Sequence, residues 1–247
     1  MIKLNLIDKP AELTVEEEKR LVGEFKANKT PVWKKTYIIK ALLKMSNSKC
    51  AYSEQALNTE SAYMEVEHFK YKDKYKDEVV RWGNLLPACK KCNMTKGDWD
   101  VIVDPIVNPL VDEPKDFLFV KSFRFYKKNL KGQNTIEAVA LNDREHFVIP
   151  RSEIGFQIAD NLEAYLENLM LGANTPGKQR NIIGKIKNLL SECGPRHIYS
   201  AVLSTYVLYE LETYKELKSY MEARGLWDSE LMEIEKELSA IALPENL

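Results

Sequence analysis

The segment PACKKCNMTKGD, residues 87–98, contains two cysteines separated by two residues, with an asparagine directly after the second. The C-x2-C spacing of Cys89 and Cys92 is typical of a turn that holds a metal ion through two thiolates. A tetrahedral zinc site needs four ligands, so these two cysteines do not complete one. The segment therefore predicts further ligands elsewhere in the chain, and it places Asn93 directly beside the metal knuckle.

One further cysteine stands upstream, where the first half of a two-knuckle zinc site belongs. Cys50 begins the sequence CAYS, and Ser53 occupies the position at which a cysteine would complete the knuckle. We therefore expect Cys50, Cys89 and Cys92 to form a structural zinc site whose fourth ligand is a different group or water. The alternative is a knuckle held without metal by packing and by a partner protein. Cys193, in an apolar context, is expected to be a buried helix residue.

Between the two knuckles lie polar residues that suit phosphodiester hydrolysis. Glu67 and His68 come near the end of YMEVEHF, residues 63–69, whose alternation predicts a strand, and Asn84 follows in WGN. Glu67 and Asn93 offer oxygen ligands, which Mg²⁺ or Mn²⁺ prefers. His68 lies on the opposite face of the strand and suits a general base, with Asn84 expected to hold its imidazole. Together they predict a one-metal phosphodiesterase.

The segments VEHFKYK, WGNLLPAC and CKKCNMTKGD resemble the His-Asn-His (HNH) nuclease motif in its ββα-metal form, in the variant whose last histidine is replaced by asparagine. The resemblance implies that His68 is the general base and Asn84 the middle asparagine. It also implies that Glu67, where aspartate is more usual, and Asn93 bind the catalytic metal. The cysteines match the structural zinc knuckles of that motif, and Ser53 departs from them.

The resemblance extends beyond the motif. KPAEL, VNPLVDEPKDFLFV and NTIEAVALNDREHFVIPR are similar to the HNH subunit of Septu anti-phage systems and of retron-linked defence cassettes, over roughly residues 1–151. This implies a metal-dependent endonuclease that acts on DNA, in complex with an ATPase of the ABC or SMC-like type that restrains it until phage infection. Two alternatives stay open: an RNase of the same chemistry, and a catalytically silent zinc-knuckle adaptor that joins an ATPase to nucleic acid.

Charge is distributed unevenly along a chain whose formal net charge is -1. Residues 68–99 carry eight basic against four acidic side chains, whereas residues 210–247 carry ten acidic against four basic ones. We therefore expect a polyanion to bind the first half of the chain, with Lys90, Lys91 and Lys96 as nucleic-acid contacts. The basic and aromatic segment KSFRFYKKNLKG either follows a nucleic-acid backbone or is an edge strand protected by lysines.

The remaining patterns predict an α+β protein that is mainly helical. A capping box at Thr14 and Glu17 predicts a first helix, and Pro31 predicts the first turn of a second. The segments at 117–128 and 134–141 are expected to pair as a β-hairpin. Four long amphipathic patterns then predict an all-helical C-terminal domain, with helices at 152–171, 177–193, 197–224 and 228–243.

The expected organisation is an N-terminal helical segment, the ββα-metal nuclease core, a proline-rich connection with the hairpin, and the helical domain, at residues 1–48, 49–103, 104–145 and 146–247. The acidity of the last domain disfavours nucleic acid there, and docking on the ATPase is one hypothesis for it. No window has the apolar length of a membrane span or a signal peptide, so we expect a cytoplasmic protein without membrane association.

Overall fold

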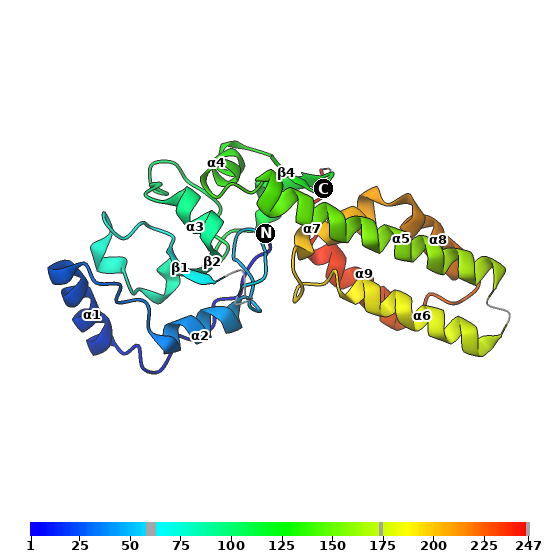
Figure 1. The fold of residues 1–247 in the computed structure, drawn as a ribbon, viewed down its shortest axis with the longest axis horizontal. Helices are drawn as coiled ribbons and strands as arrows, with labels where there is room; N and C mark the ends of the chain where they lie inside the picture. The colour runs from blue at the N-terminus through cyan, green and yellow to red at the C-terminus, as the bar shows by residue number, and fades with distance from the viewer. Residues whose placement is uncertain (58–62, 173–174, 246–247) are drawn as a thin grey trace. The chain divides into compact units, whose positions relative to one another are not determined.

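The computed structural model describes residues 1–57, 63–172 and 175–245. The chain divides into two compact units (Figure 1), the first formed by residues 1–118 and 127–141 and the second by residues 119–126 and 142–247. The described residues form mainly helices together with two small sheets, which places the protein in the α+β class. Among those residues, no helix has both the length and the apolar character that crossing a bilayer requires.

The first unit contains short helices, 3-10 turns and one two-stranded sheet. Its elements are α1 (Val15–Asn28), α2 (Thr36–Met45), β1 (Met64–His68), η1 (Lys76–Glu78), η2 (Trp82–Asn84), β2 (Leu85–Cys89), α3 (Lys90–Lys96), η3 (Pro114–Asp116) and α4 (Leu130–Ala138).

Helices α1 and α2 provide the packing layer of this unit. The capping box is confirmed, since the Thr14 hydroxyl accepts a hydrogen bond from the Glu17 amide at 3.2 Å. Apolar residues from both helices are buried in one core with residues of β1, of β2 and of the segment between them. The predicted start of the second helix was wrong: Pro31 belongs to a turn in which its carbonyl accepts from the Lys34 amide at 3.1 Å, and α2 begins only at Thr36.

The chemically rich segment forms two strands and a helix. Strands β1 and β2 pair antiparallel, with Glu67 opposite Leu86 and His68 opposite Leu85, and α3 begins immediately after Cys89 (Figure 1). Both strands were predicted from the alternation of residues 63–69 and from the extended segment after the WGN turn. The tight link between β2 and α3 carries both residues of the C-x2-C pair.

The second unit combines a β-hairpin with a helical bundle, in which five helices surround one apolar core within the described residues. Its elements are β3 (Leu118–Lys121), β4 (Arg124–Lys127), the π-helical turn η4 (Arg144–Val148), α5 (Ile149–Leu171), α6 (Pro176–Ser191), α7 (Ser200–Thr205), the π-helical turn η5 (Tyr206–Glu210), α8 (Glu212–Glu222) and α9 (Ser229–Ile241). Cys193 is buried in that core, just beyond the end of α6.

The hairpin differs from the prediction. Both of its strands come from the segment 117–128, joined by a turn at Ser122 and Phe123, while the predicted partner at 134–141 lies mostly in α4. The turn residues have φ values of 47° and 63°, which are unusual for residues other than glycine. Helix α4 forms instead of a strand because the Asn129 side chain caps it, accepting from the Gly132 amide at 3.1 Å.

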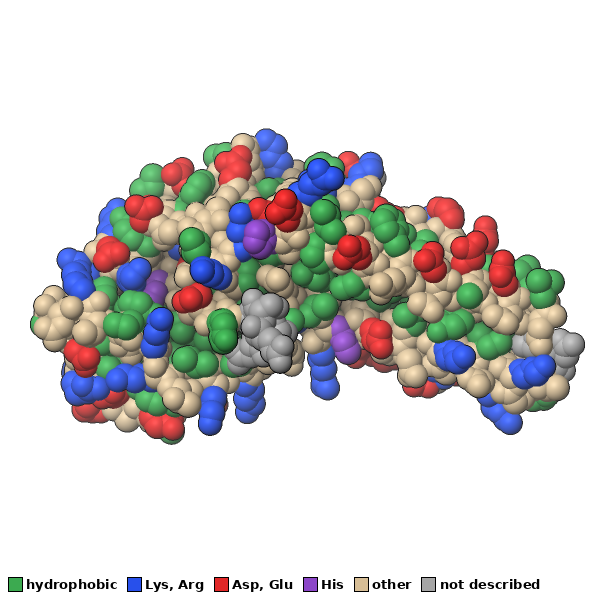
Figure 2. All heavy atoms as spheres, in the orientation of Figure 1, with side chains coloured by type: hydrophobic (Ala, Val, Ile, Leu, Met, Phe, Trp, Pro, Cys, Tyr) green, Lys and Arg blue, Asp and Glu red, His purple; other side chains and the backbone are tan. Residues whose placement is uncertain are grey.

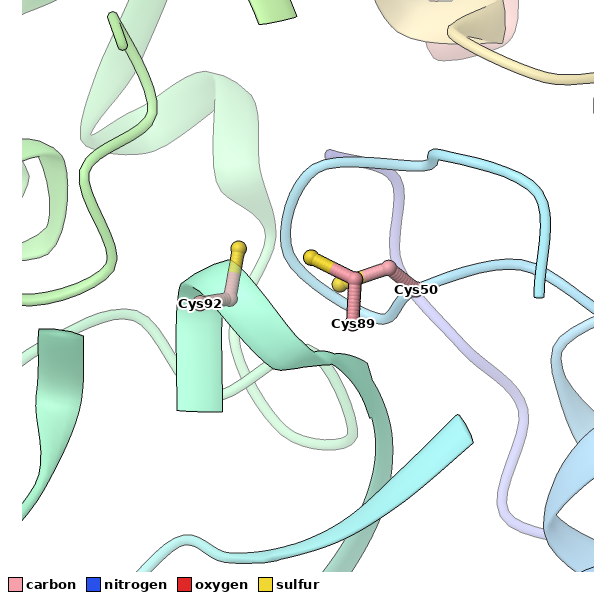
Figure 3. Close-up of side chains that lie close together, drawn as sticks. All are labelled: Cys50, Cys89 and Cys92. Atoms are coloured by element: carbon pink, nitrogen blue, oxygen red, sulfur yellow. The ribbon is translucent and has the colours of Figure 1, made fainter. Parts of the chain in front are cut away.

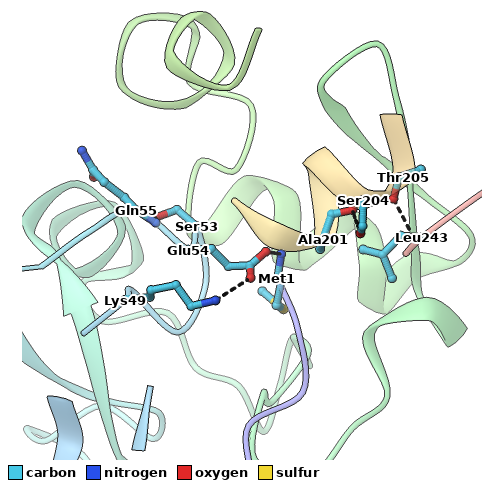
Figure 4. A network of polar contacts seen from close by, with 9 residues as sticks. All are labelled: Met1, Lys49, Ser53, Glu54, Gln55, Ala201, Ser204, Thr205 and Leu243. Atoms are coloured by element: carbon cyan, nitrogen blue, oxygen red, sulfur yellow. Dashed lines mark hydrogen bonds and ion pairs between the residues drawn. The ribbon is translucent and has the colours of Figure 1, made fainter. Parts of the chain in front are cut away.

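The predicted helix over 197–224 is interrupted. It divides into α7, η5 and α8, with Leu211 in an extended conformation between the last two. Thr205 helps to fix this region, because its hydroxyl donates to the Ala201 carbonyl at 2.5 Å and accepts from the Leu243 amide at 2.8 Å (Figure 4). The sequence carries no proline or glycine at the break, so its apolar periodicity alone predicted one continuous helix.

Candidate active site and cysteine cluster

A cleft of about 450 Å³ opens in the first unit beside the end of β1 and the beginning of α3. Glu67, His68 and Asn93 all line it, so three of the four residues expected to perform the chemistry are brought together. Glu67 and His68 are consecutive residues of β1, so their side chains project to opposite sides of the strand. They therefore enter the cleft from different directions. Asn93 is contributed by the first turn of α3.

His68 is almost fully buried, and its ring orientation is fixed. Its Nε2 lies 2.9 Å from the carbonyl oxygen of Val79, and a carbonyl only accepts, so Nε2 carries the proton of the neutral ring and Nδ1 is the basic atom. The ring also packs edge-on against Trp33, with 4.6 Å between ring centroids. Burial lowers the pKa of His68 to about 4, although the hydrogen bond to Val79 raises it, so the imidazole is neutral at pH 7.

Asn84 does not hold the imidazole, contrary to the expectation. Its side chain accepts from the Lys70 amide at 2.7 Å and donates to the carbonyl oxygens of Lys70 and Glu78 at 3.2 and 3.1 Å. These bonds tie Asn84 to the loop after β1 and to Glu78, the last residue of η1, and the next residue is Val79, whose carbonyl holds His68. Asn84 therefore acts on the orientation of His68 through the loop backbone rather than by direct contact.

Glu67 is buried and paired with a buried lysine. Its Oε1 lies 2.6 Å from Nζ of Lys96, which also donates to the carbonyl oxygen of His68 at 2.9 Å. Burial raises the pKa of Glu67 to about 7, although the Lys96 ammonium lowers it. The carboxylate therefore depends on a nearby positive charge to remain ionised in this position.

The three lysines expected to contact nucleic acid differ in how far they are buried. Lys96 is fully buried in its ion pair, which corrects the expectation that it faces a phosphate. No sequence signal predicts this burial, because the lysine follows a polar helix turn. Lys90 is exposed and Lys91 half-buried on the first turn of α3, and neither is among the described residues that line the cleft.

The sequence patterns did not predict several residues that line the cleft, among them Trp33, Lys34 and Lys72. Trp33 packs on His68, while Lys34, which is exposed, and Lys72, which is half-buried, also line the cleft. Nζ of Lys72 also lies 5.8 Å from the centroid of the Trp33 ring. Trp33 and Lys34 come from the turn that was predicted to be helix, about thirty residues before β1, and nothing local in the sequence connects them with His68.

The cysteines form a buried cluster outside this cleft. The sulfur atoms of Cys50, Cys89 and Cys92 all lie within 4.8 Å of one another, and they come from the turn after α2, the end of β2 and α3 (Figure 3). A tetrahedral zinc site with Zn–S bonds of about 2.3 Å places its sulfurs about 3.8 Å apart, so the spacing suits such an ion. The cluster therefore has the composition and geometry to hold a metal ion such as zinc.

The ionisation of the thiols supports the same conclusion. Burial raises the pKa of Cys50, but hydrogen bonds from Cys89, Cys92 and Ser53 together lower it well below its usual value. The pKa of Cys89 is raised to about 12, chiefly by its hydrogen bond to Cys50, and burial raises that of Cys92. The thiolate form is therefore favoured for Cys50 and disfavoured for Cys89 and Cys92, and a bound dication favours ionisation of all three.

Ser53 lies beside the cluster rather than turned away from it. Its hydroxyl oxygen is 3.7 Å from the Cys89 sulfur and accepts from the Gln55 amide at 3.3 Å. The next residue, Glu54, is buried and pairs with the Met1 ammonium at 2.9 Å and with Lys49 Nζ at 3.3 Å (Figure 4). This network fixes the turn that carries Cys50 and Ser53.

Two proteins with the same description are similar to this chain. Septu protein PtuB of Bacillus thuringiensis is 41% identical over 234 residues, which cover 93% of this chain and 90% of that protein. Septu protein PtuB of Bacillus mycoides strain KBAB4 is 26% identical over 224 residues, which cover 71% of this chain and 75% of that protein. No family model matches the sequence. No solved structure matches it either.

Proposed function

The chain belongs to the Septu PtuB family, and from this membership and the geometry of the cleft we propose that it is a metal-dependent HNH endonuclease of an anti-phage defence system. The observation that carries the proposal is the convergence of Glu67, His68 and Asn93 on one cleft, at the junction of two antiparallel strands and a helix. This set contains a neutral base and two oxygen ligands, which is what hydrolysis of a phosphodiester requires.

His68 acts as the general base in this proposal. Its Nδ1 accepts a proton from the attacking water, while Nε2 stays bound to the carbonyl of Val79 and keeps the ring in place. Asn84 holds the loop that carries this carbonyl, and Trp33 limits rotation of the ring on the other side. The water oxygen then bonds to phosphorus, and the bond from phosphorus to the leaving oxygen breaks.

Glu67 and Asn93 would hold the catalytic metal. A carboxylate and an amide oxygen are hard ligands, and Mg²⁺ commonly uses one or two protein carboxylates while keeping several waters, so the residues present suit Mg²⁺ or Mn²⁺. Bound there, such an ion would supply charge stabilisation to the phosphoryl oxygens and to the leaving oxygen. Lys96 neutralises the buried Glu67 carboxylate and keeps it close to the cleft.

We propose DNA as the substrate and an ATPase of the ABC or SMC-like type as the partner, both on the strength of the family resemblance. The test is a cleavage assay of the purified complex on DNA and on RNA, with Mg²⁺ or with EDTA, and with or without ATP. We expect cleavage of DNA that requires Mg²⁺. Defence against phage in cells, together with no cleavage of either nucleic acid under any of these conditions, would instead support an adaptor function.

Cationic and anionic side chains are interspersed over the face seen in Figure 2. Nucleic-acid binding to the first unit therefore depends on local groups, and Lys34 and Lys72 are the lysines among the described residues that line the cleft. The double variant Lys34→Gln, Lys72→Gln is expected to raise KM by about tenfold and leave kcat within about twofold, since each lysine contacts a phosphate beside the scissile one.

The salt dependence gives a second readout for this pair. Loss of two phosphate contacts should reduce the slope of log KM against log salt by about 1.5. Lys40→Gln is the matched control, because Lys40 is an exposed lysine of α2 that is not among the residues lining the cleft. An equal rise in KM for the control, or a fall in kcat at constant KM for the pair, would contradict the assignment.

A further inference from the structure

The hairpin β3–β4 presents a face that the proposed reaction does not use. Its side chains alternate, so that Val120 and Phe125 are buried, while Phe119 and Arg124 are half-buried and Lys121 and Tyr126 are exposed. We call the solvent side the outer hairpin face, and it consists of Phe119, Lys121, Arg124 and Tyr126. The exposed fraction is 61% for the Lys121 side chain and 42% for Tyr126.

The turn of the hairpin is anchored on the helices of the second unit. Phe123 packs so closely over Gly155 that a Cβ added there would lie 2.2 Å from Cε1 of the ring, and it also contacts Tyr206 with 4.5 Å between centroids. The Ser122 amide donates to the Glu210 carboxylate at 2.9 and 3.2 Å. These contacts explain how the turn keeps positive φ at two residues other than glycine, and they make the hairpin a rigid support.

Both edges of the hairpin already have hydrogen-bond partners. On β3 the Val120 amide donates to the carbonyl of Leu243 at 2.7 Å. On β4 the Phe125 amide donates to Asn142 Oδ1 and the Phe125 carbonyl accepts from Asn142 Nδ2, both at 2.8 Å. The cations of this segment are therefore not needed to protect an open edge, which was the alternative explanation of the sequence pattern. Strand addition by a partner is disfavoured for the same reason.

The outer hairpin face combines stacked aromatic rings with cations. The rings of Phe119 and Tyr126 are stacked, with 5.2 Å between centroids and 18° between planes. The two-residue turn places Lys121 opposite Arg124, where like charges disfavour the hairpin. Lys121 reaches one exposed carboxylate, Glu245, at 3.4 Å, and Arg124 forms no ion pair with any residue that the structure describes. The stability of the fold therefore does not explain this pair of charges.

We propose that the outer hairpin face binds a single-stranded segment of nucleic acid, with a base stacked on Tyr126 and phosphates on Lys121 and Arg124. An exposed tyrosine ring flanked by cations matches an unpaired strand, since the bases of that strand offer free π-faces and its backbone is anionic. A duplex hides those faces and offers only phosphates. The inference rests on the proposed function, because it takes the substrate to be a nucleic acid. It adds that one segment of this substrate is single-stranded.

The test measures binding of a fluorescent oligothymidylate of about 20 nucleotides to the full chain, by fluorescence anisotropy without added Mg²⁺ so that cleavage plays no part. Tyr126→Ser is expected to raise the Kd for this strand by about tenfold and the Kd for a blunt duplex of equal length by less than about twofold. Arg124→Gln should weaken both, because both carry phosphates. Tyr209→Ser is the matched control, since Tyr209 is also exposed, at 40%, and lies on η5.

Three results would overturn the proposal. The first is an unchanged Kd for the oligothymidylate with Tyr126→Ser, and the second is an equal loss for strand and duplex. The third is a variant of this face, Tyr126→Ser or Arg124→Gln, that binds the strand as wild type does but no longer co-purifies with the ATPase. That result would assign the outer hairpin face to a protein partner. Failure of the wild-type complex to cleave DNA, with strand binding still dependent on Tyr126, would count against the nuclease and not against this surface.

Discussion

His68→Ala is expected to abolish cleavage, lowering kcat of the complex by about a thousandfold or more while KM changes little. The reason is that Nδ1 of His68 is the basic atom of a ring that is already neutral and already oriented, and alanine leaves no group that can accept the proton. No second imidazole is available at the cleft, because His68 is the one histidine among its described lining residues. Substrate contacts made by the cleft lysines remain in place.

The measurement is single-turnover cleavage of DNA by the purified complex in saturating Mg²⁺. His146→Ala is the control, since His146 is an exposed histidine of η4 that bonds only Asp143 among the described residues. His68 is buried and packs on Trp33, so His68→Asn is tested in parallel to keep more of the side-chain volume, and thermal unfolding reports on the fold. Activity within about tenfold of wild type in either variant would refute the role of His68 as general base.

The sequence predicts the local framework of this site well, because the framework depends on short-range signals. Alternation of apolar and polar residues predicts β1, and the C-x2-C spacing predicts the turn between β2 and α3. Because Asn93 is the residue after Cys92, the turn that places Cys92 also places Asn93 in α3. The clustering of Cys50 with the later cysteines also follows from their ligand spacing, although the chain between them includes residues outside those the structure describes.

The partners of the site residues were harder to predict, because they depend on contacts between distant segments. Asn84 was assigned to His68, yet two of its hydrogen bonds go to Lys70 in the loop after β1 and one goes to Glu78 in η1. Lys96 looks like a surface lysine, and only the folded arrangement shows that it enters the interior to meet Glu67. Trp33 reaches His68 from a turn whose residues also fit a helix pattern. In each case the side-chain type was informative and the direction of the side chain was not.

The hairpin shows a different kind of failure. A two-residue turn with two positive φ values normally requires glycine or asparagine, and the serine and phenylalanine at this turn give no such signal. The conformation is stable because Phe123 fits over Gly155, a glycine that lies more than thirty residues further along the chain. A local preference was therefore overridden by tertiary packing, and the strand pairing was assigned to the wrong segment for that reason.

The second large effect is expected from the cysteine cluster. Elemental analysis of the purified chain should find one zinc ion per chain, and Cys50→Ser should remove most of it and lower the melting temperature of the first unit by more than about 10 °C. A structural zinc ion is bound by folded protein alone, so its binding free energy adds to the free energy of unfolding. Without the ion, nothing holds together the three buried sulfur atoms, which all lie within 4.8 Å of one another.

Cys193→Ser is the matched control, because Cys193 is equally buried but lies in the core of the second unit, so zinc content should not change. Ser53→Cys is expected to bind zinc more tightly, since it adds a thiolate at a position whose hydroxyl already lies 3.7 Å from the Cys89 sulfur. Wild-type protein that carries no zinc and yet keeps full stability in EDTA would show instead that packing alone holds the knuckle.

Loss of the ion should also lower activity, and the physical reason is adjacency. Cys92 anchors the first turn of α3 to the cluster, and Asn93, the next residue, lines the cleft. Release of Cys92 frees the turn that places the Asn93 side chain, so Cys92→Ser should raise the Mg²⁺ concentration needed for half-maximal cleavage by about tenfold or more. Met94→Ala, at an exposed position of the same helix, should leave it unchanged. An unchanged Mg²⁺ requirement in zinc-free Cys92→Ser protein would show that the cluster and the catalytic site are independent.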